Sequence, residues 1–155
     1  MHPTLYKLPS IGQTQSLTTV TDRWEFMTID TMATWHSVAK NQDIEGLHRL
    51  LADDAVFHSP VVHTPQVGKA ITGKYLGAAL LVFYNDTFKY VREATGERQA
   101  ILEFEVEIDG IQVNGVDMIS WNEEGLINDF KVMIRPLKAV NLIHQNMGAM
   151  LQARG

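Results

Sequence analysis

A helix-to-strand transition at residues 43–60, DIEGLHRLLADDAVFHSP, constrains the fold of this chain more than any other stretch. Its first half carries apolar residues at helical spacing and predicts a short amphipathic helix. Asp53-Asp54 is expected to end that helix, and residues 55–58 are typical of a strand, which the following proline closes. The segments before this stretch can pack under it as helices. Most of the later chain is typical of long strands that wrap around it.

The N-terminal region divides into an arm and a helix. Residues 1–20 are polar, contain two prolines and lack periodicity, which indicates an arm outside a single domain over residues 21–155. Residues 22–40 carry one apolar stripe at helical spacing, so we expect a helix that Thr21 or Asp22 caps. A chain of 155 residues has the length of one domain and can bury a sizeable core.

A third helix precedes a change of hydrophobic period. Residues 72–84 predict a helix with Thr72 as its cap. From residue 88 the period becomes two, and we expect Tyr90 and Arg92 to share one face of a strand. Residues 102–108 alternate apolar side chains with glutamates and form the clearest amphipathic strand of the chain.

The last third of the chain predicts a meander and a final helix. Asp109-Gly110 is a two-residue hairpin signal, because both residue types tolerate positive φ. Strands are expected over residues 111–121 and 126–135, and an amphipathic helix follows Pro136. Helices first and a meander afterwards indicate an α+β fold. A curved antiparallel sheet that wraps around the N-terminal helices would form a cone with an interior pocket.

Composition excludes several classes of function. The net charge is −5 and no Lys/Arg cluster occurs, which argues against nucleic acid and against anionic membrane surfaces. The absence of cysteine excludes disulfides and thiolate metal sites. No apolar run approaches the length of a membrane span, and no secretory signal pattern begins the chain, so a cytoplasmic location is expected.

Two stretches resemble a known family. LHRLLADDAVFHSP at 47–60 and VDMISWNEEGLINDFKVMIRPL at 116–137 are similar to the nuclear transport factor 2-like fold, closest to its SnoaL-like and ketosteroid-isomerase-like branch. The resemblance covers about residues 22–137. It implies a homodimer, which we expect to form through the outer face of the sheet. It does not imply one activity, because the family includes isomerases, cyclases, dehydratases, epoxide hydrolases and binding modules.

The residues at the family's catalytic positions differ from those of known isomerases. The resemblance places Ser59 where ketosteroid isomerases carry their aspartate base, and Trp35 where they carry an oxyanion-binding tyrosine. Asp117 matches their second oxyanion donor, so two of three roles are changed and the same isomerase machinery is not expected. Val132 stands where a limonene-epoxide-hydrolase-like site would need its third polar residue, which also argues against that activity.

Asp117 and His58 are the candidate catalytic residues. Asp117 lies in the middle of an apolar strand, and burial there would raise its pKa and let it donate a proton. His58 ends the first strand, and histidine suits acid–base chemistry near neutral pH. Spacing does not support a metal site, and neither a metal nor a cofactor is predicted. The remaining candidates for the ligand-binding wall are Trp35, His63, Ile119, Trp121, Phe130, Val132 and Ile134.

Three hypotheses about function remain open. The first is binding of a small, mostly apolar, oxygen-containing molecule without catalysis. The second is cofactor-free acid–base chemistry next to a carbonyl (isomerisation, cyclisation or dehydration) with His58 as base and Asp117 as proton donor. The third is an assembly module whose cone is packed solid. The distance between the two candidate groups and the space inside the cone distinguish them.

Overall fold

The computed structural model describes residues 29–155 of the chain, so the predicted arm over residues 1–20 lies outside the described part. The elements are, in chain order, α2 (Thr31–Asn41), α3 (Ile44–Leu50), β1 (Leu51–His58), β2 (Gln66–Val67), α4 (Lys69–Phe83), β3 (Lys89–Thr95), β4 (Gln99–Ile108), β5 (Ile111–Trp121), β6 (Ile127–Arg135) and α5 (Leu137–Ala153).

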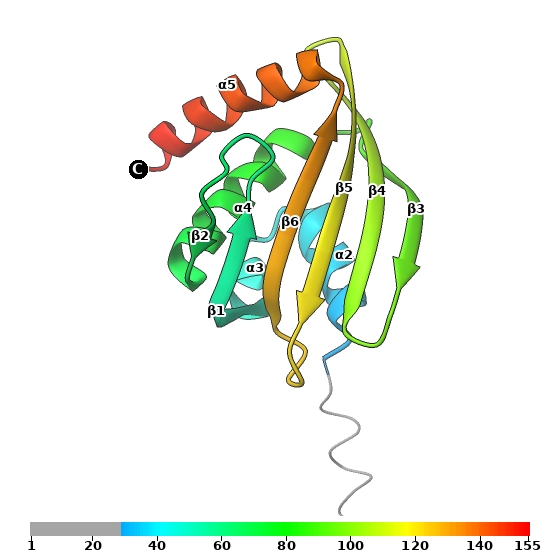
Figure 1. Ribbon diagram of the computed structural model, residues 1–155, viewed down its shortest axis with the longest axis vertical. Helices are drawn as coiled ribbons and strands as arrows, with labels where there is room; N and C mark the ends of the chain where they lie inside the picture. The colour runs from blue at the N-terminus through cyan, green and yellow to red at the C-terminus, as the bar shows by residue number, and fades with distance from the viewer. Residues whose placement is uncertain (1–28) are drawn as a thin grey trace, which may run out of the picture.

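A curved six-stranded sheet forms the frame, with the strand order β2-β1-β6-β5-β4-β3. Figure 1 shows α2, α3 and α4 against one face of this sheet, with α5 extending from the end of β6 towards α4. The predicted α+β class is confirmed. One strand pair, β1 with β6, is parallel, so the sheet is mixed rather than purely antiparallel. None of the helices within residues 29–155 is long and apolar enough to cross a membrane.

The predicted hairpin between β4 and β5 is confirmed. Asp109 and Gly110 have φ values of 50° and 73°, the positive values that a tight two-residue turn requires. The turn sets a register without interruption, from Ile108 opposite Ile111 to Leu102 opposite Asp117 and beyond. The turn therefore decides which face of β5 each residue occupies, including the face of Asp117.

Two helices begin at other residues than those predicted. Asp30 caps α2, its carboxylate accepting a hydrogen bond from the backbone N–H of Ala33 at 3.0 Å, and Ile29 and Asp30 are not helical. A continuous helix over 22–40 is therefore wrong, and its predicted cap lies outside the described residues. The helix α4 begins at Lys69, after Gly68, so Thr72 lies inside the helix and does not cap it. The Thr72 hydroxyl donates instead to the Ala55 carbonyl at 3.0 Å.

The strand β1 begins earlier than predicted. It starts at Leu51, so Asp53-Asp54 lies inside the strand rather than in a break after the helix. The pairing of β1 with β6 shifts register between Leu51 and Val56. This irregularity leaves both carboxylates exposed while Leu51 is buried, and it lets the chain change from helix to strand without a loop.

A bulge in β3 overturns the prediction that Tyr90 and Arg92 share a face. The register against β4 shifts between these two residues, from Tyr90 opposite Phe104 to Arg92 opposite Glu103. Arg92 therefore meets Glu103 on the outer face, with Nε and Oε2 3.4 Å apart. Tyr90 precedes the bulge and keeps its side chain on the inner face, whereas the extra residue reverses the alternation for Arg92, which follows it.

Candidate functional site

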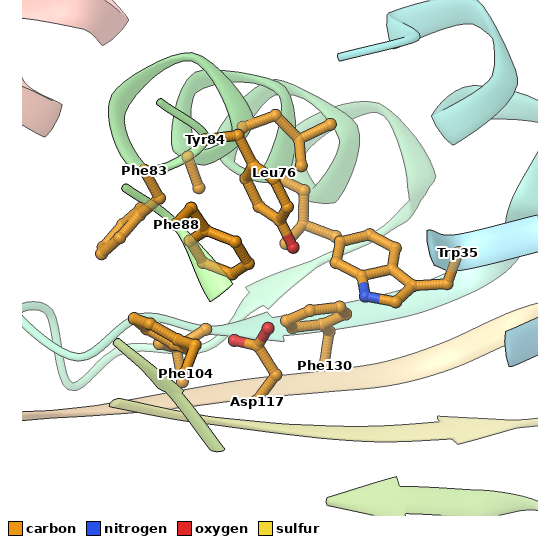
Figure 2. A pocket seen from close by; sticks show the side chains of 11 residues that line it. Trp35, Leu76, Phe83, Tyr84, Phe88, Phe104, Asp117 and Phe130 are labelled. Carbon is orange, nitrogen blue, oxygen red and sulfur yellow. The ribbon is translucent and has the colours of Figure 1, made fainter. Parts of the chain in front are cut away.

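The inner face of the sheet and the helices α2 and α4 enclose a small aromatic cavity. Its volume is about 30 Å³, which is room for about one water molecule. Figure 2 shows the rings that surround it and the Asp117 carboxylate, which lies among them. The lining is Trp35, Leu76, Ala79, Leu80, Phe83, Tyr84, Phe88, Phe104, Asp117, Phe130 and Val132. The cone is thus nearly filled by side chains in this conformation.

Asp117 is held in this interior by its place in β5. It lies between Leu102 of β4 and Val132 of β6, and its neighbours on the same face, Gly115 and Ile119, are also buried. Only 6% of the Asp117 surface is exposed. Strand alternation and the hairpin register therefore force a carboxyl group into an apolar chamber.

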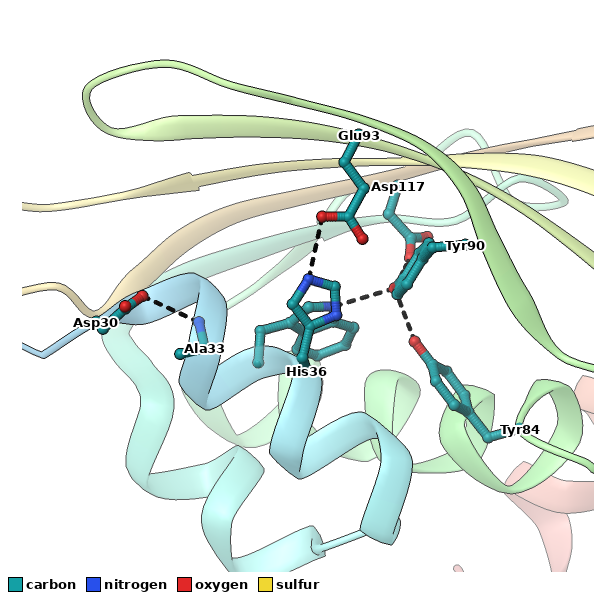
Figure 3. A network of polar contacts seen from close by, with 8 residues as sticks. Asp30, Ala33, His36, Tyr84, Tyr90, Glu93 and Asp117 are labelled. Carbon is teal, nitrogen blue, oxygen red and sulfur yellow. Dashed lines mark hydrogen bonds and ion pairs between the residues drawn. The ribbon is translucent and has the colours of Figure 1, made fainter.

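Two tyrosines and a tryptophan form a hydrogen-bonded chain with Asp117. Figure 3 shows its part from Asp117 through Tyr90 to Tyr84. The Tyr90 hydroxyl donates to Asp117 Oδ2 at 2.8 Å. The Tyr84 and Tyr90 hydroxyl oxygens are 2.7 Å apart, and Trp35 Nε1–H donates to the Tyr90 oxygen at 3.0 Å. These side chains come from α2, from the residue after α4, from β3 and from β5. The site therefore joins four separate parts of the chain.

Burial dominates the electrostatics of the cluster. No Lys, Arg or His side chain within residues 29–155 pairs with Asp117. Desolvation therefore raises the pKa of Asp117 to about 7, against a smaller opposing effect of the Tyr90 hydrogen bond. The pKa values of Tyr84 and Tyr90 are also raised, first by burial and then by the nearby Asp117 charge. Near neutral pH both forms of the carboxyl group are accessible.

A surface groove lies on the other side of the tyrosines. It has a volume of about 610 Å³ and runs between α2 and the start of β3, with His36, Lys40 and Gln42 along one side. Tyr84 and Phe88 line both this groove and the inner cavity, and their stacked ring centroids are 3.9 Å apart. Together with Tyr90, which also lines the groove, these two rings separate the Asp117 carboxylate from the outside.

The residues predicted for the binding wall divide into three groups. Trp35, Phe130 and Val132 line the cavity together with Asp117. Ile119 is fully buried opposite Phe130 but does not border the cavity, and Trp121 is partly buried at the end of β5. Ile134 and His63 border a different groove, of about 510 Å³, beside the loop that follows β1.

His58 lies on the opposite face of the sheet from Asp117. Its neighbour Phe57 is buried inside, so the alternation of β1 turns His58 outwards. There its Nε2 is 2.8 Å from Asp129 Oδ2. The structure does not bring His58 and Asp117 together, and one small ligand cannot contact both. Within residues 29–155 no three His, Asp or Glu side chains lie close enough to hold a metal ion.

Sequence reasoning missed Tyr84 and Tyr90 as members of the site. One signal was available, because a tyrosine buried among apolar residues usually needs a partner for its hydroxyl. Tyr90 shares the inner face with Phe88, and both tyrosines are half-buried. Their common partner could not be inferred, since it depends on where α4 ends relative to β5.

The comparisons with known proteins agree with this architecture. Residues 32–130 match the family model described as SnoaL-like domain. A crystal structure of a steroid delta-isomerase from Pseudomonas aeruginosa is 36% identical, with a TM-score of 0.75, and the match covers 80% of this chain and 90% of that one. An uncharacterised protein with a cystatin-like fold from Silicibacter pomeroyi DSS-3 is 32% identical, with a TM-score of 0.72 and coverage of 81% and 88%.

A more distant match bears on the fold alone. An NTF2-like protein of unknown function from Mesorhizobium loti is 17% identical, with a TM-score of 0.60 and coverage of 69% and 89%. No curated protein matches the chain. The family resemblance predicted from the sequence is confirmed.

Proposed function

Because the chain belongs to the SnoaL-like family, we propose that it binds a small, largely apolar molecule that carries at least one oxygen atom, and that Asp117 and its tyrosine partners hold that oxygen. The observation that carries the proposal is the burial of a single carboxyl group, that of Asp117, among aromatic rings. Among the described residues, Asp117 is the one acidic or basic side chain that is buried. A polar group among aromatic rings is the arrangement that orients an apolar ligand in a pocket.

Binding requires the chamber to open. A cavity of about 30 Å³ holds no organic molecule of useful size. Tyr84 and Phe88 line both the cavity and the surface groove, and an outward movement of the Phe88 ring would enlarge the cavity without breaking the hydrogen bond between Tyr84 and Tyr90. Both residues lie at or beyond the end of α4, where the backbone is in loop conformation. A ligand would enter there and replace aromatic contacts with its own apolar surface. The oxygen would then reach the hydroxyl–carboxyl chain.

The test is a binding titration with aromatic probes of about naphthalene size. We expect 2-acetylnaphthalene and 2-naphthol to perturb Trp35, which lines the cavity and can be followed by its indole N–H signal in NMR. Val132→Trp should block binding by filling the chamber. The control Val67→Trp, at an exposed site on β2, should leave binding unchanged. Equal binding by wild type and Val132→Trp would overturn the proposal.

A second candidate function, acid–base isomerisation, rests on the similarity to the steroid delta-isomerase. His58 is not available as the base for a ligand in the chamber. Ser59 does not replace it, since its Oγ accepts the backbone N–H groups of Val61 and Val62 at 3.2 and 3.3 Å. A carboxyl group with a pKa of about 7 is itself a suitable base, so the ionised Asp117 would take the proton. Once Asp117 is protonated, Tyr84 would donate its O–H to the oxyanion.

The isomerase candidate is tested with a steroid ketone whose double bond can move into conjugation, followed by absorbance. We expect turnover in the wild type and loss of about 100-fold or more in Asp117→Asn, which removes the base. Binding of that ketone without turnover would leave the binding function and exclude this activity.

We also propose a homodimer through the outer face of the sheet. Ile101 and Met133 are 50% and 53% exposed there, next to Val116 and Met118 on the strand between them. These residues make an apolar patch on an otherwise charged face, which suits a second copy of the chain. Met133→Glu should shift the mass measured by light scattering from dimer to monomer. Leu137→Glu, at an exposed position on α5, is the control.

A further inference from the structure

The direction of each hydrogen bond between Asp117 and the surface groove follows from counting the protons that its partners carry. Each tyrosine has one O–H, and the Trp35 indole can only donate. When Asp117 is ionised it only accepts, so the Tyr90 proton points to it. Tyr90 then has only its oxygen to offer, and the Tyr84 O–H must donate to that oxygen. In this state Tyr84 presents lone pairs, and no proton, to anything beyond it.

Protonation of Asp117 reverses the direction of these hydrogen bonds. The neutral carboxyl group carries a proton that needs an acceptor, and Tyr90 is its hydrogen-bond partner among the described residues. Placing that proton on the other carboxyl oxygen would leave it facing apolar rings, which costs free energy. Asp117 therefore donates to Tyr90 and Tyr90 donates to Tyr84. The Tyr84 proton is left free to donate outwards.

We propose that Tyr84 is the residue that meets the ligand's oxygen, and that the protonation state of Asp117 decides whether Tyr84 offers it a hydrogen-bond donor or an acceptor. The inference rests on the proposed binding function and adds a specificity rule to it. Tyr90 also lines the groove, but its hydroxyl group is fully engaged by Asp117, Trp35 and Tyr84. Tyr84 borders both the cavity and the groove and has hydrogen-bonding capacity left for an entering molecule. A carbonyl compound is preferred by the protonated form, and a phenol or alcohol by the ionised form.

The surroundings contain few other groups that titrate. From α2, His36 lies edge-on to the Tyr90 ring with centroids 5.3 Å apart, and it pairs with Glu93 of β3 at 3.3 Å. Asp86 and Lys89, along with Lys40, lie on the groove side. The residues of β4 and β6 that border the cavity are apolar: Phe104, Phe130 and Val132. Within residues 29–155, His36 is thus the side chain other than Asp117 and Tyr84 that packs on Tyr90 and can carry a charge.

The experiment compares two matched probes at two pH values. The acceptor-only ketone 2-acetylnaphthalene and the donor 2-naphthol are titrated at about pH 5.5 and about pH 8.5, on either side of the Asp117 pKa of about 7. We expect the ratio of the two affinities to change by about tenfold or more between these conditions, in favour of the ketone at the lower pH.

Three variants and a control assign the effect. Asp117→Asn, Tyr90→Phe and Tyr84→Phe should each abolish the change of preference, because each interrupts the chain. Tyr75→Phe, at a tyrosine of α4 that packs on Phe57 and lies outside this chain of hydrogen bonds, should retain it. Without ligand, the Trp35 indole signal should titrate once, near pH 7, in the wild type and should not titrate in Asp117→Asn.

The outcomes separate the inference from the function on which it rests. Binding of both probes with no change of preference would overturn the inference and leave the binding function standing. Failure of both probes to bind at either pH would overturn both. A change of preference that persists in Asp117→Asn, or disappears in His36→Gln, would assign the effect to another group and overturn the inference.

Discussion

The inner and outer faces of one sheet place a carboxylate in opposite environments. On the inner face, Asp117 of β5 is surrounded by rings, has no cationic partner among the described residues, and has a raised pKa. On the outer face, Asp129 of β6 lies 2.8 Å from His58 and remains 44% exposed. The pairing of β5 with β6 is uninterrupted from Asp117 opposite Val132 to Ser120 opposite Asp129, so strand alternation places the two carboxylates on opposite faces. In a curved sheet, the face to which strand alternation turns a carboxylate therefore decides whether it is solvated or available for chemistry.

The largest expected effect is the difference in stability between replacing a buried and replacing an exposed apolar residue. Phe130→Ala removes a ring that packs on Trp35 and Phe57, and it should lower the free energy of unfolding by about 3–5 kcal/mol. Val67→Ala, at an exposed position of β2, should change it by less than about 0.5 kcal/mol. Urea denaturation of both variants measures this difference. Similar losses for the two variants would mean that the chamber is not the stabilising core.

The next effect is the pH dependence of stability that results from the burial of the Asp117 carboxyl group. The folded pKa of Asp117 is about 7 and the unfolded value is 3.8, so between these values the folded state holds the extra proton. The contribution of Asp117 to stability is therefore full at low pH and falls as the pH rises through 7, by a few kcal/mol at most. Asp117→Asn should gain stability relative to the wild type between about pH 4 and about pH 8. A difference between the two proteins that does not vary with pH would contradict the assignment.

A smaller effect distinguishes a glycine on the inner face from one on a helix. A Cβ at Gly115 would collide with the Phe104 ring and lie 2.9 Å from the Met133 carbonyl oxygen, so Gly115→Ala should cost about 1–3 kcal/mol. Gly148 in α5 has open space around the same position, and Gly148→Ala should stabilise the fold by up to about 1 kcal/mol. Thermal unfolding should move the two melting temperatures in opposite directions. Two shifts of the same sign would show that the inner face is looser than its contacts indicate.

The smallest expected effect comes from the outer ion pair. Asp129→Asn removes the charge opposite His58, whose side chain is 28% exposed, and should cost no more than about 1 kcal/mol. The loss should shrink further as the salt concentration rises. Unfolding curves at low and high ionic strength measure it. A loss as large as that of Phe130→Ala would mean that the outer face is buried more deeply than the single chain shows.

Much of the fold was accessible from the sequence, because it depends on local patterns. The alternation in residues 102–108 and the Asp109-Gly110 turn together determine the hairpin, its register and the inward direction of Asp117. The inward direction of Phe130 and Val132 follows from the same period on β6. Errors arose where one residue breaks a period, as at the β3 bulge and at Asp53-Asp54, because a bulge leaves little trace in composition.

The sequence alone determined that a carboxyl group would enter an apolar interior, since strand alternation acts over a few neighbouring residues. Only the tertiary structure decided what that carboxyl group meets. Tyr84 and Tyr90 reach Asp117 because α4 ends opposite a bulged edge strand, and His58 turns away because Phe57 occupies the inner side of β1. The size of the cavity is likewise a tertiary quantity, because it is the small difference between the volume enclosed by the sheet and the summed volume of the side chains that fill it.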